Sequence, residues 1–249
     1  MVAFNMGVCA VRVMELWRYP VKSMQGERVT STAIGPLGIA GDRQFGVLDQ
    51  QTNVVLSARR APALLQCEAK QLDGVVVITL PDGQACRAQD ADPILSEFLG
   101  RNVQVLGARN GDETLDWNSA TGSGKEPLEA VLPQRLWDSS PVHLLSTRCI
   151  AQLATTHRHH DWSVRRFRPN VVVELAPHES SEDEWQGEFA LGSALCALRK
   201  PTARCVVTTR AQPGIEVDKA ILQIVSAERD GDLGIYAYVQ RPGIVAVDS

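Results

Sequence analysis

Alternation of apolar and polar residues dominates the first third of the chain. This two-residue period is typical of half-buried β-strands. It predicts strands over residues 9–17, 25–34, 45–49, 54–56, 66–72 and 75–80. Asp73-Gly74, between the last two strands, is a pair preferred in two-residue hairpin turns. We therefore expect an antiparallel β meander, although the pattern does not show whether it closes into a barrel.

Two segments carry helix signals. Residues 92–100 start with Asp92 as N-cap and a proline, have apolar residues one turn apart and end on Gly100, which predicts a short helix. A second helix is predicted over residues 146–154, with Ser146 as its N-cap. Further strands are predicted over residues 103–106, 142–145, 171–175, 191–198 and 235–239, and within 241–247. The predicted fold class is mainly β with short helices.

Two stretches lack a clear period. Residues 109–127 are polar and rich in Gly and Ser, a composition typical of an exposed connection or a domain boundary. We therefore predict two β-rich domains, residues 1–118 and 119–249. Beyond Thr209, a turn and a polar stretch up to Asp232 are expected to be an irregular link between strands.

Composition limits the classes of function. With 249 residues, 44% apolar and 22% charged, the chain is long enough for one large or two small globular domains. The net charge of −4, a pI near 5.8 and the lack of a run of five basic residues argue against nucleic acid as a partner. The sequence shows no signal peptide and no apolar run near the roughly 18 residues of a membrane span. We therefore expect a cytoplasmic or organelle-matrix protein.

The six cysteines, at positions 9, 67, 86, 149, 196 and 205, form no Cys-x-x-Cys pair. They are too scattered for a zinc or iron–sulfur framework and are expected to be reduced thiols. His157, His159 and His160 form a histidine-rich patch that admits two interpretations, a metal cluster or a solvated helix end. The second is favoured, because no carboxylate or thiol lies at ligand spacing.

Cys205 lies between Arg204 and a Val-Val-Thr-Thr run. A neighbouring guanidinium favours the ionised form of a thiol. Pro201 cannot donate to a central-strand ladder, which predicts a loop that leaves the sheet near Cys205. A cysteine between apolar residues is also a common core residue. The residues alone therefore leave a reactive thiol and a buried core thiol as alternatives.

Four basic residues near predicted strand ends or turns are candidates for binding an anion: Lys22, Arg43, Arg168 and Arg204. Lys22 comes with a hydroxyl, Ser23, past a strand end, where a solvated surface turn is the alternative. Arg43 follows a Gly-rich turn, and an ion pair with Asp42 is its alternative. Arg165, Arg166 and Arg168 lie within four positions, and carboxylates on one local strand are too few to pair with all three. Arg168 is therefore the arginine expected to bind an anionic ligand. Four cations and one thiol describe a site for a phosphate-bearing ligand that carries a soft metal.

Four motifs occur in order along the chain: Tyr-Pro-Val-Lys-Ser at 19–23, Gly-Asp-Arg-Gln-Phe at 41–45, Arg-Phe-Arg-Pro-Asn at 166–170 and Arg-Cys-Val-Val-Thr-Thr at 204–209. Together they resemble the molybdenum cofactor sulfurase C-terminal (MOSC) family, and within it the branch of the amidoxime reducing component. The resemblance extends from about Val13 to Val247. It implies a β-barrel MOSC domain preceded by an N-terminal β-rich MOSC subdomain.

The resemblance also implies a cofactor, a site and a reaction. Cys205 matches the molybdenum-ligating cysteine of the family and would be the catalytic residue. The residues that match cofactor-binding positions, the last three by place or spacing, are Lys22, Ser23, Arg43, Arg168, Asn170, Ala203, Arg204, Asp138, Ser139 and Tyr236. The implied cofactor is Mo-molybdopterin. The implied reaction is the two-electron reduction of N-hydroxylated or N-oxygenated compounds.

Two partners follow from the resemblance, a small N-hydroxylated substrate and an electron donor. The sequence has no Gly-x-Gly-x-x-Gly turn and no set of cluster-binding cysteines. We therefore expect a separate donor protein, such as a haem protein, a ferredoxin or a flavin reductase. The membrane anchor of eukaryotic relatives and the ferredoxin domain of some bacterial ones find no counterpart in this sequence. Two alternatives stay open: a molybdenum cofactor or sulfur carrier without turnover, and a β-barrel binding module in which Cys205 is a core residue.

Overall fold

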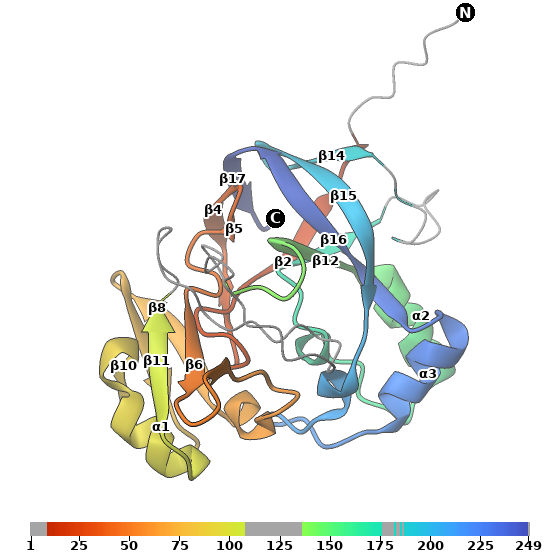
Figure 1. The fold of residues 1–249 in the computed structure, drawn as a ribbon. Helices are drawn as coiled ribbons and strands as arrows, with labels where there is room; N and C mark the ends of the chain where they lie inside the picture. The colour runs from red at the N-terminus through yellow and green to blue at the C-terminus, as the bar shows by residue number, and fades with distance from the viewer. Residues whose placement is uncertain (1–8, 108–135, 176–181, 183–184, 186, 249) are drawn as a thin grey trace, which may run out of the picture.

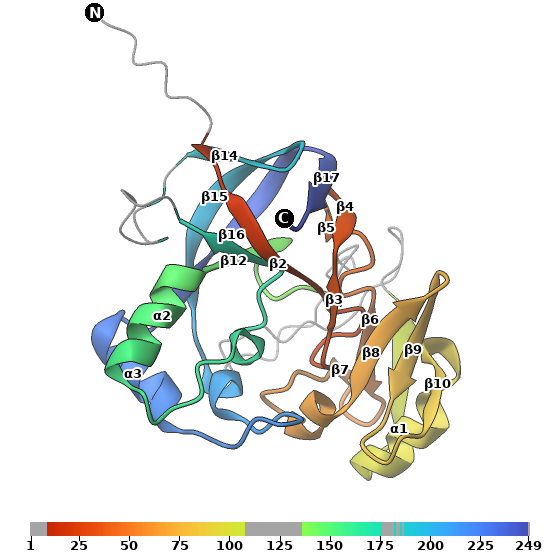
Figure 2. The same ribbon diagram turned by 180° about the vertical axis from the view of Figure 1, so that it is seen from behind.

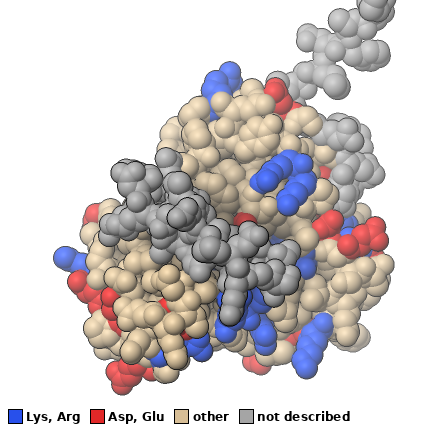
Figure 3. Space-filling model, viewed as in Figure 1, with Lys and Arg blue, Asp and Glu red and all other residues tan. Residues whose placement is uncertain are grey.

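The computed structural model describes residues 9–107, 136–175, 182, 185 and 187–248, and Figure 1 shows them in two lobes. The larger lobe holds a curved eight-stranded sheet with two helices beside it. The smaller lobe holds two three-stranded sheets and one helix. The prediction of a mainly β fold with short helices is confirmed. The face in Figure 3 mixes acidic and basic groups, and several Lys and Arg groups lie low on it between the lobes.

The eight-stranded sheet, seen from behind in Figure 2, draws its strands from both ends of the chain. In spatial order they are β1 (Cys9–Ala10), β14 (Glu188–Leu191), β15 (Ala194–Ala203), β16 (Asp232–Arg241), β12 (Val142–Ser146), β13 (Val171–Glu174), β2 (Arg12–Arg18) and β3 (Glu27–Val29). Beside it, β4 (Ser31–Gly35) pairs with β5 (Gly38–Ile39) and with β17 (Gly243–Ala246). The two ends of the chain therefore share one lobe.

A β-bulge decides which face of β2 is buried. Val13 and Leu16 are at most 2% exposed and belong to the same core, although they lie three residues apart. The register against β13 shifts between Val172 and Val173, so β2 has one residue more than its partner at this point. The extra residue restores both side chains to the core face, where Ile235 of β16 also packs.

The smaller lobe packs two sheets and a helix around its own core. Its elements are β6 (Phe45–Asp49), β7 (Val54–Val55), β8 (Glu68–Leu72), β9 (Val75–Thr79), β10 (Ala85–Arg87), β11 (Val103–Gly107), α1 (Asp92–Leu99) and the 3-10 helices η1 (Pro62–Gln66) and η2 (Ala88–Asp90). Val47, Ile78 and Leu95 are fully buried in this core. Val21 and Met24, from the segment between β2 and β3, insert into it as well. That segment therefore ties the smaller lobe to the larger one.

A third apolar cluster lies beside the large sheet, under α2 (Thr147–Thr156) and α3 (Ala220–Glu228) (Figures 1 and 2). The 3-10 helices η3 (Val164–Arg166) and η5 (Val206–Thr209) belong to the same part of the chain. Phe167 is stacked on Trp162 here, with ring centroids 6.3 Å apart. Among the helices of the described residues, none has the length and apolar composition needed to cross a bilayer.

Local sequence signals predicted several turns and helix ends correctly. Asp73 and Gly74 have φ of 48° and 82°, as a type I′ hairpin turn requires, and they join β8 to β9. Gly100 ends α1 with a φ of 63°, and Ser146 caps α2 by accepting a hydrogen bond from Arg148 N. Asp92, the predicted N-cap of α1, instead lies inside the helix and accepts a hydrogen bond from the backbone of β11 at 2.7 Å.

Two predictions about the C-terminal part are wrong. The polar stretch before β16 contains α3, whose buried Ile221 and Val225 lie four residues apart on one face. Pro201 lies within β15, contrary to the expectation that it is excluded from the strand; the chain leaves the sheet only after Ala203, so the predicted loop near Cys205 is present. β14 pairs only with the first four residues of β15, so one edge of β15 is open at Pro201 and tolerates a residue without an N–H group.

The predicted boundary between residues 118 and 119 lies outside the described residues. Pairing of β2 with β13, and of β4 with β17, joins strands from the two predicted domains. The division into two domains therefore stays a prediction.

Candidate functional site

The segment from Tyr19 to Gly26 joins β2 to β3 and is buried along its whole length. Its backbone is tied to the smaller lobe: Lys22 N donates to Phe45 O at 2.8 Å, and Gln25 N donates to Cys67 O at 2.9 Å. Because β2 and β3 belong to the sheet of the larger lobe, this segment bridges the lobes. It carries Lys22 to the place where they meet.

Arg43 and Arg168 share one aromatic partner, Tyr19. Their guanidinium carbons lie 4.5 and 4.4 Å from the centroid of the Tyr19 ring. Arg43 also forms an ion pair with Asp42, and Arg168 Nη1 donates to Met24 O at 2.6 Å. Three segments far apart in the sequence thus bring two cations together around a buried phenol. The predicted alternative for Arg43, pairing with its neighbour, occurs as well and leaves Arg43 in the cluster.

Lys22 and Asp138 add an ion pair to this cluster. The Lys22 side chain is 7% exposed, and its ammonium also donates to Leu136 O at 3.1 Å. The Asp138 side chain is 76% exposed, so water screens its side of the pair. Desolvation raises the pKa of the Asp138 carboxyl, but the charges of Lys22, Arg43 and Arg168 outweigh it and lower the pKa. Asp138 therefore lies within electrostatic reach of three of the four predicted cations.

Arg204, the fourth cation, directs its described hydrogen bonds to acceptors other than the neighbouring thiol. It donates to Thr202 O at 3.1 Å, to Phe167 O at 2.9 Å and to His143 Nε2 at 2.8 Å. Desolvation lowers the pKa of Arg204, and Tyr236 and Cys205 oppose this shift. The guanidinium is thus fixed by the protein while it remains within electrostatic reach of Cys205.

His143, on β12, is a buried neutral base. An arginine can only donate, so Nε2 of His143 is the acceptor and Nδ1 carries the proton, directed at Arg168 O at 3.4 Å. Desolvation first, and then the charge of Arg204, lower the pKa of His143 well below its ordinary value. His143 therefore links the environments of Arg168 and Arg204 without adding charge.

We expect His143 to make the protein less stable in acid. Its pKa lies well below 6.5 in the folded state, whereas the unfolded chain titrates near that value, so the unfolded state binds more protons below about pH 6.5. The free energy of unfolding contributed by this group therefore falls as the pH falls through that window. Urea unfolding of the wild type and His143→Gln between about pH 5 and pH 7.5 should show a smaller acid loss in the variant. Parallel curves would contradict the prediction.

Tyr236 is within electrostatic reach of Arg43, in the cluster around Tyr19, and of Arg204, beside Cys205. It lies opposite His143 in the β12–β16 pairing, with ring centroids 5.5 Å apart. Burial raises the pKa of its hydroxyl, Arg204 and Arg43 lower it, and Asp138 and Cys205 raise it. The Tyr236 hydroxyl is thus within electrostatic reach of four predicted site residues, Arg43, Asp138, Arg204 and Cys205.

Two predicted site residues use their side chains inside the protein. Ser23 Oγ accepts a hydrogen bond from Ala58 N at 2.8 Å. Asn170 Oδ1 accepts one from His143 N at 3.2 Å, and its amide donates to Trp17 O at 3.4 Å. Both are buried, so in this arrangement they shape the backbone around the site.

Ser139 and Ala203 lie at the margin of the region. The carbonyl of Ser139 accepts a hydrogen bond from Arg199. Ala203 is exposed at the end of β15, opposite Asp232 of β16. Any contact of these two residues with a ligand stays a prediction.

Three of the predicted positions have a left-handed backbone. In the described residues, φ is positive for six residues other than glycine: Ser23, Arg43, Asn53, Asp73, Arg168 and Asp230. Asn and Asp tolerate this conformation, but Ser and Arg adopt it at a cost in free energy. Such strain tends to persist where the surrounding structure holds a functional side chain in place. Its concentration at Ser23, Arg43 and Arg168 supports a site here.

Sequence reasoning missed Arg166 and Tyr19. Arg166 is 1% exposed and donates to three backbone carbonyls, of Asp161, Thr208 and Glu216. The bond to Thr208 O reaches η5, which begins directly after Cys205. Both residues lie inside the quoted motifs, so motif membership was the available signal. Arg166 also pairs with the Asp161 carboxylate at 3.7 Å, so carbonyl acceptors add to carboxylate pairing in this short segment.

The histidine-rich patch lies away from these residues, at the end of α2. His157 Nε2 contacts the carboxylate of Glu228 at 2.5 Å, and His160 Nδ1 contacts that of Asp218 at 2.7 Å. In the part of the chain that the structure describes, no group of three or more His, Cys, Asp or Glu side chains is placed to hold a metal ion.

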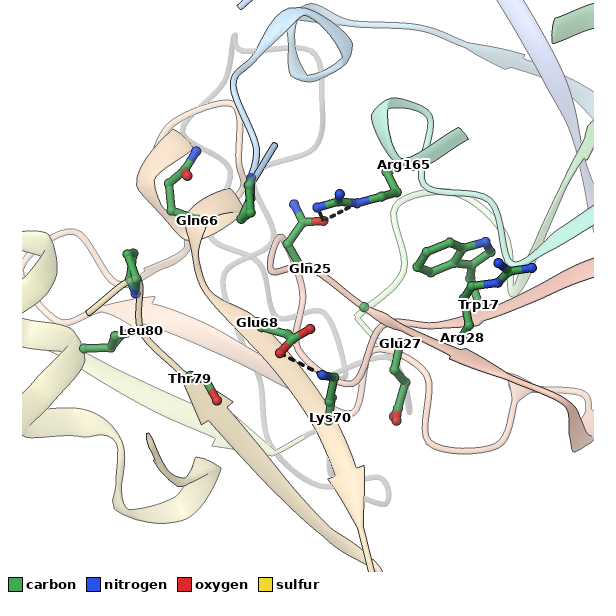
Figure 4. Close-up of a pocket in the computed structure, with 13 residues that line it drawn as sticks. Trp17, Gln25, Glu27, Arg28, Gln66, Glu68, Lys70, Thr79, Leu80 and Arg165 are labelled. Carbon is green, nitrogen blue, oxygen red and sulfur yellow. Dashed lines mark hydrogen bonds and ion pairs between the residues drawn. The ribbon is translucent and has the colours of Figure 1, made fainter. Parts of the chain in front are cut away.

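A polar groove of about 630 Å³ lies on the other side of the Tyr19–Gly26 segment (Figure 4). Its lining includes Trp17, Gln25 and Arg165, and Arg165 donates to Gln25 Oε1 at 3.1 Å. Glu68 and Lys70 form an ion pair on its wall. The groove contains none of the predicted cofactor-binding residues.

Several curated relatives carry the name mitochondrial amidoxime reducing component. The bovine component 2 is 23% identical in an alignment of 229 residues, and the match covers 79% of this chain and 66% of that protein. The human component 1 is 24% identical in an alignment of 287 residues, and the match covers 94% of this chain and 80% of that protein. A molybdenum cofactor sulfurase from Danio rerio is 25% identical in an alignment of 262 residues, and the match covers 89% of this chain and 31% of that protein. The chain thus spans slightly less than two thirds of the bovine relative and about a third of the sulfurase.

Solved structures are similar only at a low level. A crystal structure described as that of a hypothetical protein has a TM-score of 0.46 at 10% identity, over all of this chain and 69% of that one. The YUAD protein from Bacillus subtilis has a TM-score of 0.42 at 13% identity, over 95% of this chain and 91% of that one.

Two family models cover almost the whole chain. The MOSC N-terminal beta barrel domain matches residues 10–121, and the MOSC domain matches residues 132–249. The resemblance deduced from the four motifs is therefore confirmed, and the chain belongs to the MOSC family.

Proposed function

We propose that this protein is a molybdenum-cofactor-dependent oxidoreductase that reduces N-hydroxylated or N-oxygenated compounds, with Cys205 as the metal ligand. The observation that supports it most is geometric: Arg43 and Arg168 meet at the Tyr19 ring, and His143 joins the carbonyl of Arg168 to the guanidinium of Arg204, the residue before Cys205. The names of the curated relatives point to the same substrate class, amidoximes.

The residues fit a phosphate-bearing cofactor with a soft metal. Lys22 pairs with Asp138 and Arg43 pairs with Asp42, while Asp232 and Glu182 act electrostatically on Arg204. The described hydrogen bond of Arg168 goes to a neutral carbonyl, so its charge is available to an anion. Cys205 is partly exposed at the start of η5, and a thiolate suits a soft metal. In this proposal the cations hold the phosphate and Cys205 holds the metal.

The net reaction adds two electrons and two protons to an N–OH group, breaks the N–O bond, forms an N–H bond and releases water. When bound, the cofactor supplies the redox centre for this reaction. The protein residues bind and orient. Tyr236, whose pKa burial raises, keeps its proton and offers a neutral hydroxyl near Cys205. The two electrons come from a separate donor protein, a haem protein, a ferredoxin or a flavin reductase.

The proposal is tested by turnover with an artificial donor. Protein loaded with molybdenum cofactor should reduce benzamidoxime to benzamidine with reduced viologen and should be inactive with NADH or NADPH alone. The second expectation rests on the absence of a dinucleotide-binding glycine motif from the sequence. Loaded protein that gives no benzamidine with viologen would overturn the proposal.

The match to a molybdenum cofactor sulfurase supports one alternative, a carrier of cofactor or sulfur without turnover. Metal analysis separates the two. Near-stoichiometric molybdenum and pterin with turnover support the reductase. A metal-free protein with labile sulfur on Cys205 supports the carrier.

A further inference from the structure

Tyr19 stands at the centre of the cation cluster, yet it is too buried to touch a ligand itself. Its side chain is 2% exposed, and no hydrogen-bond partner of its hydroxyl is found in the described structure. We propose that Tyr19 is a positioning residue, whose ring holds Arg43 and Arg168 as a pair shaped to bind a phosphate monoester. This inference rests on the proposed function, because it assigns that phosphate to the cofactor.

Two guanidinium groups near each other need a reason to stay together. The pKa of Arg168 is lowered to about 10, mainly by desolvation and also by the charge of Arg43. An aromatic face carries negative partial charge that attracts cations, and the attraction is strongest where water is excluded. The distances of 4.5 and 4.4 Å put both guanidinium carbons in range of one ring. The ring therefore offsets part of the repulsion between the two cations.

The ring is itself fixed by its surroundings. A Cβ atom on Gly26 would lie 2.5 Å from Cδ1 of Tyr19, so the glycine backbone packs directly against the ring. The Trp17 ring stacks nearby, with centroids 6.3 Å apart and planes at 17°. Gly26 is thus required by close approach, and it leaves the ring little freedom to move away from the cations.

Hydrogen bonds of the Tyr19 backbone connect it to Asp42 and Arg43. Tyr19 N donates to Asp42 Oδ1 at 2.8 Å, and Arg43 N donates to Tyr19 O at 2.7 Å. Asp42 pairs in turn with the Arg43 guanidinium. Tyr19 therefore sets both the backbone and the side chain of Arg43, while it reaches Arg168 through the ring alone.

The hydroxyl of Tyr19 is not the group that does this. Burial raises its pKa to about 12, so the phenol is neutral, and a buried hydroxyl without a partner costs free energy. Removing it should leave the folded state as stable as before, or more stable. A phenylalanine keeps the ring and a leucine does not, so the two substitutions separate the role of the ring from that of the hydroxyl.

Phosphate binding to cofactor-free protein tests the inference. Titration calorimetry with inorganic phosphate should give a dissociation constant for Tyr19→Phe within about threefold of the wild type, and one at least tenfold weaker for Tyr19→Leu. Thermal unfolding of each variant controls for folding. If Tyr19→Leu fails to fold, Tyr19→Met replaces it, because methionine also lacks the ring; it should weaken phosphate binding at least threefold. Gly26→Ala is unsuitable, because its Cβ would meet the backbone oxygen of Arg18 as well as the ring.

The outcomes separate this inference from the proposed function. Phosphate affinity that is unchanged in a folded Tyr19→Leu or Tyr19→Met variant would overturn the role of the ring. Equal losses in Tyr19→Phe and Tyr19→Leu would assign the effect to the hydroxyl and also overturn it. If phosphate binds with the expected ranking but the purified wild type holds no molybdenum, the positioning role stands and the proposed reductase fails.

Discussion

Replacing Cys205 with alanine is expected to remove molybdenum from the purified protein and to reduce viologen-driven turnover to the background without protein. Cys205 is partly exposed beside the fixed cation of Arg204. Burial raises the pKa of Cys67 and Cys149 to about 12 and that of Cys196 to about 11, so those thiols keep their protons. A protonated, buried thiol is a poor metal ligand. None of these three buried cysteines should therefore replace the lost ligand.

The measurement is molybdenum and pterin content per chain, followed by turnover of benzamidoxime. Cys86→Ala is the matched control, because Cys86 is also partly exposed but lies in the smaller lobe. The control should keep its metal and its rate. Full molybdenum content in folded Cys205→Ala would show that this thiol does not hold the metal.

Replacing Arg168 is expected to weaken phosphate binding to cofactor-free protein at least tenfold and to lower bound molybdenum. A charge-assisted hydrogen bond contributes about 1.5–3 kcal/mol, and Arg168 is one of the two cations at the Tyr19 ring. Arg168→Gly and Arg168→Ala should lose binding alike. They should differ in stability, because φ is 55° at this position and only glycine adopts it without strain. We expect Arg168→Gly to exceed Arg168→Ala by about 1 kcal/mol in free energy of unfolding.

Phosphate titration and urea unfolding measure the two effects separately. Arg165→Ala is the control, because Arg165 belongs to the same short segment but donates to Gln25 on the side of the groove. Its phosphate affinity should match that of the wild type. Equal weakening in Arg165→Ala would mean that the effect follows the overall charge of the segment and not the place of Arg168.

Much of the fold could be predicted from the sequence, because strand and turn formation depends on residues close together in the chain. The alternation of residues 66–72 and 75–80 with Asp73-Gly74 between them predicts a hairpin because strand faces and turn dihedrals depend on neighbouring residues. The order of the four motifs was enough to indicate the family. The helix α3 was missed although Ile221 and Val225 have helical spacing, because most residues of this helix are apolar and no single apolar face stands out.

Tertiary structure decided that Pro201 lies within a strand and which side chains of β2 are buried. A proline fits a strand where the edge that would need its N–H group has no partner strand. β14 pairs with β15 only as far as Ala197, so Pro201 lies beyond this pairing. The bulge opposite Val172 and Val173 similarly decides that Val13 and Leu16 share a core. The bulge depends on β13, a strand distant in sequence from β2, and the open edge depends on where β14 ends; no local period encodes either.

The sequence by itself determined which residues could carry the chemistry: a thiol, four cations and their motifs. Only the tertiary structure decided how each side chain is used. It ties Ser23 and Asn170 to the backbone, brings Arg43 and Arg168 to one aromatic ring and sets neutral His143 against Arg204. The physical reason is that a polar group takes the partner nearest in space, and burial sets its charge state, whereas a motif records only the residue type and its neighbours in the chain.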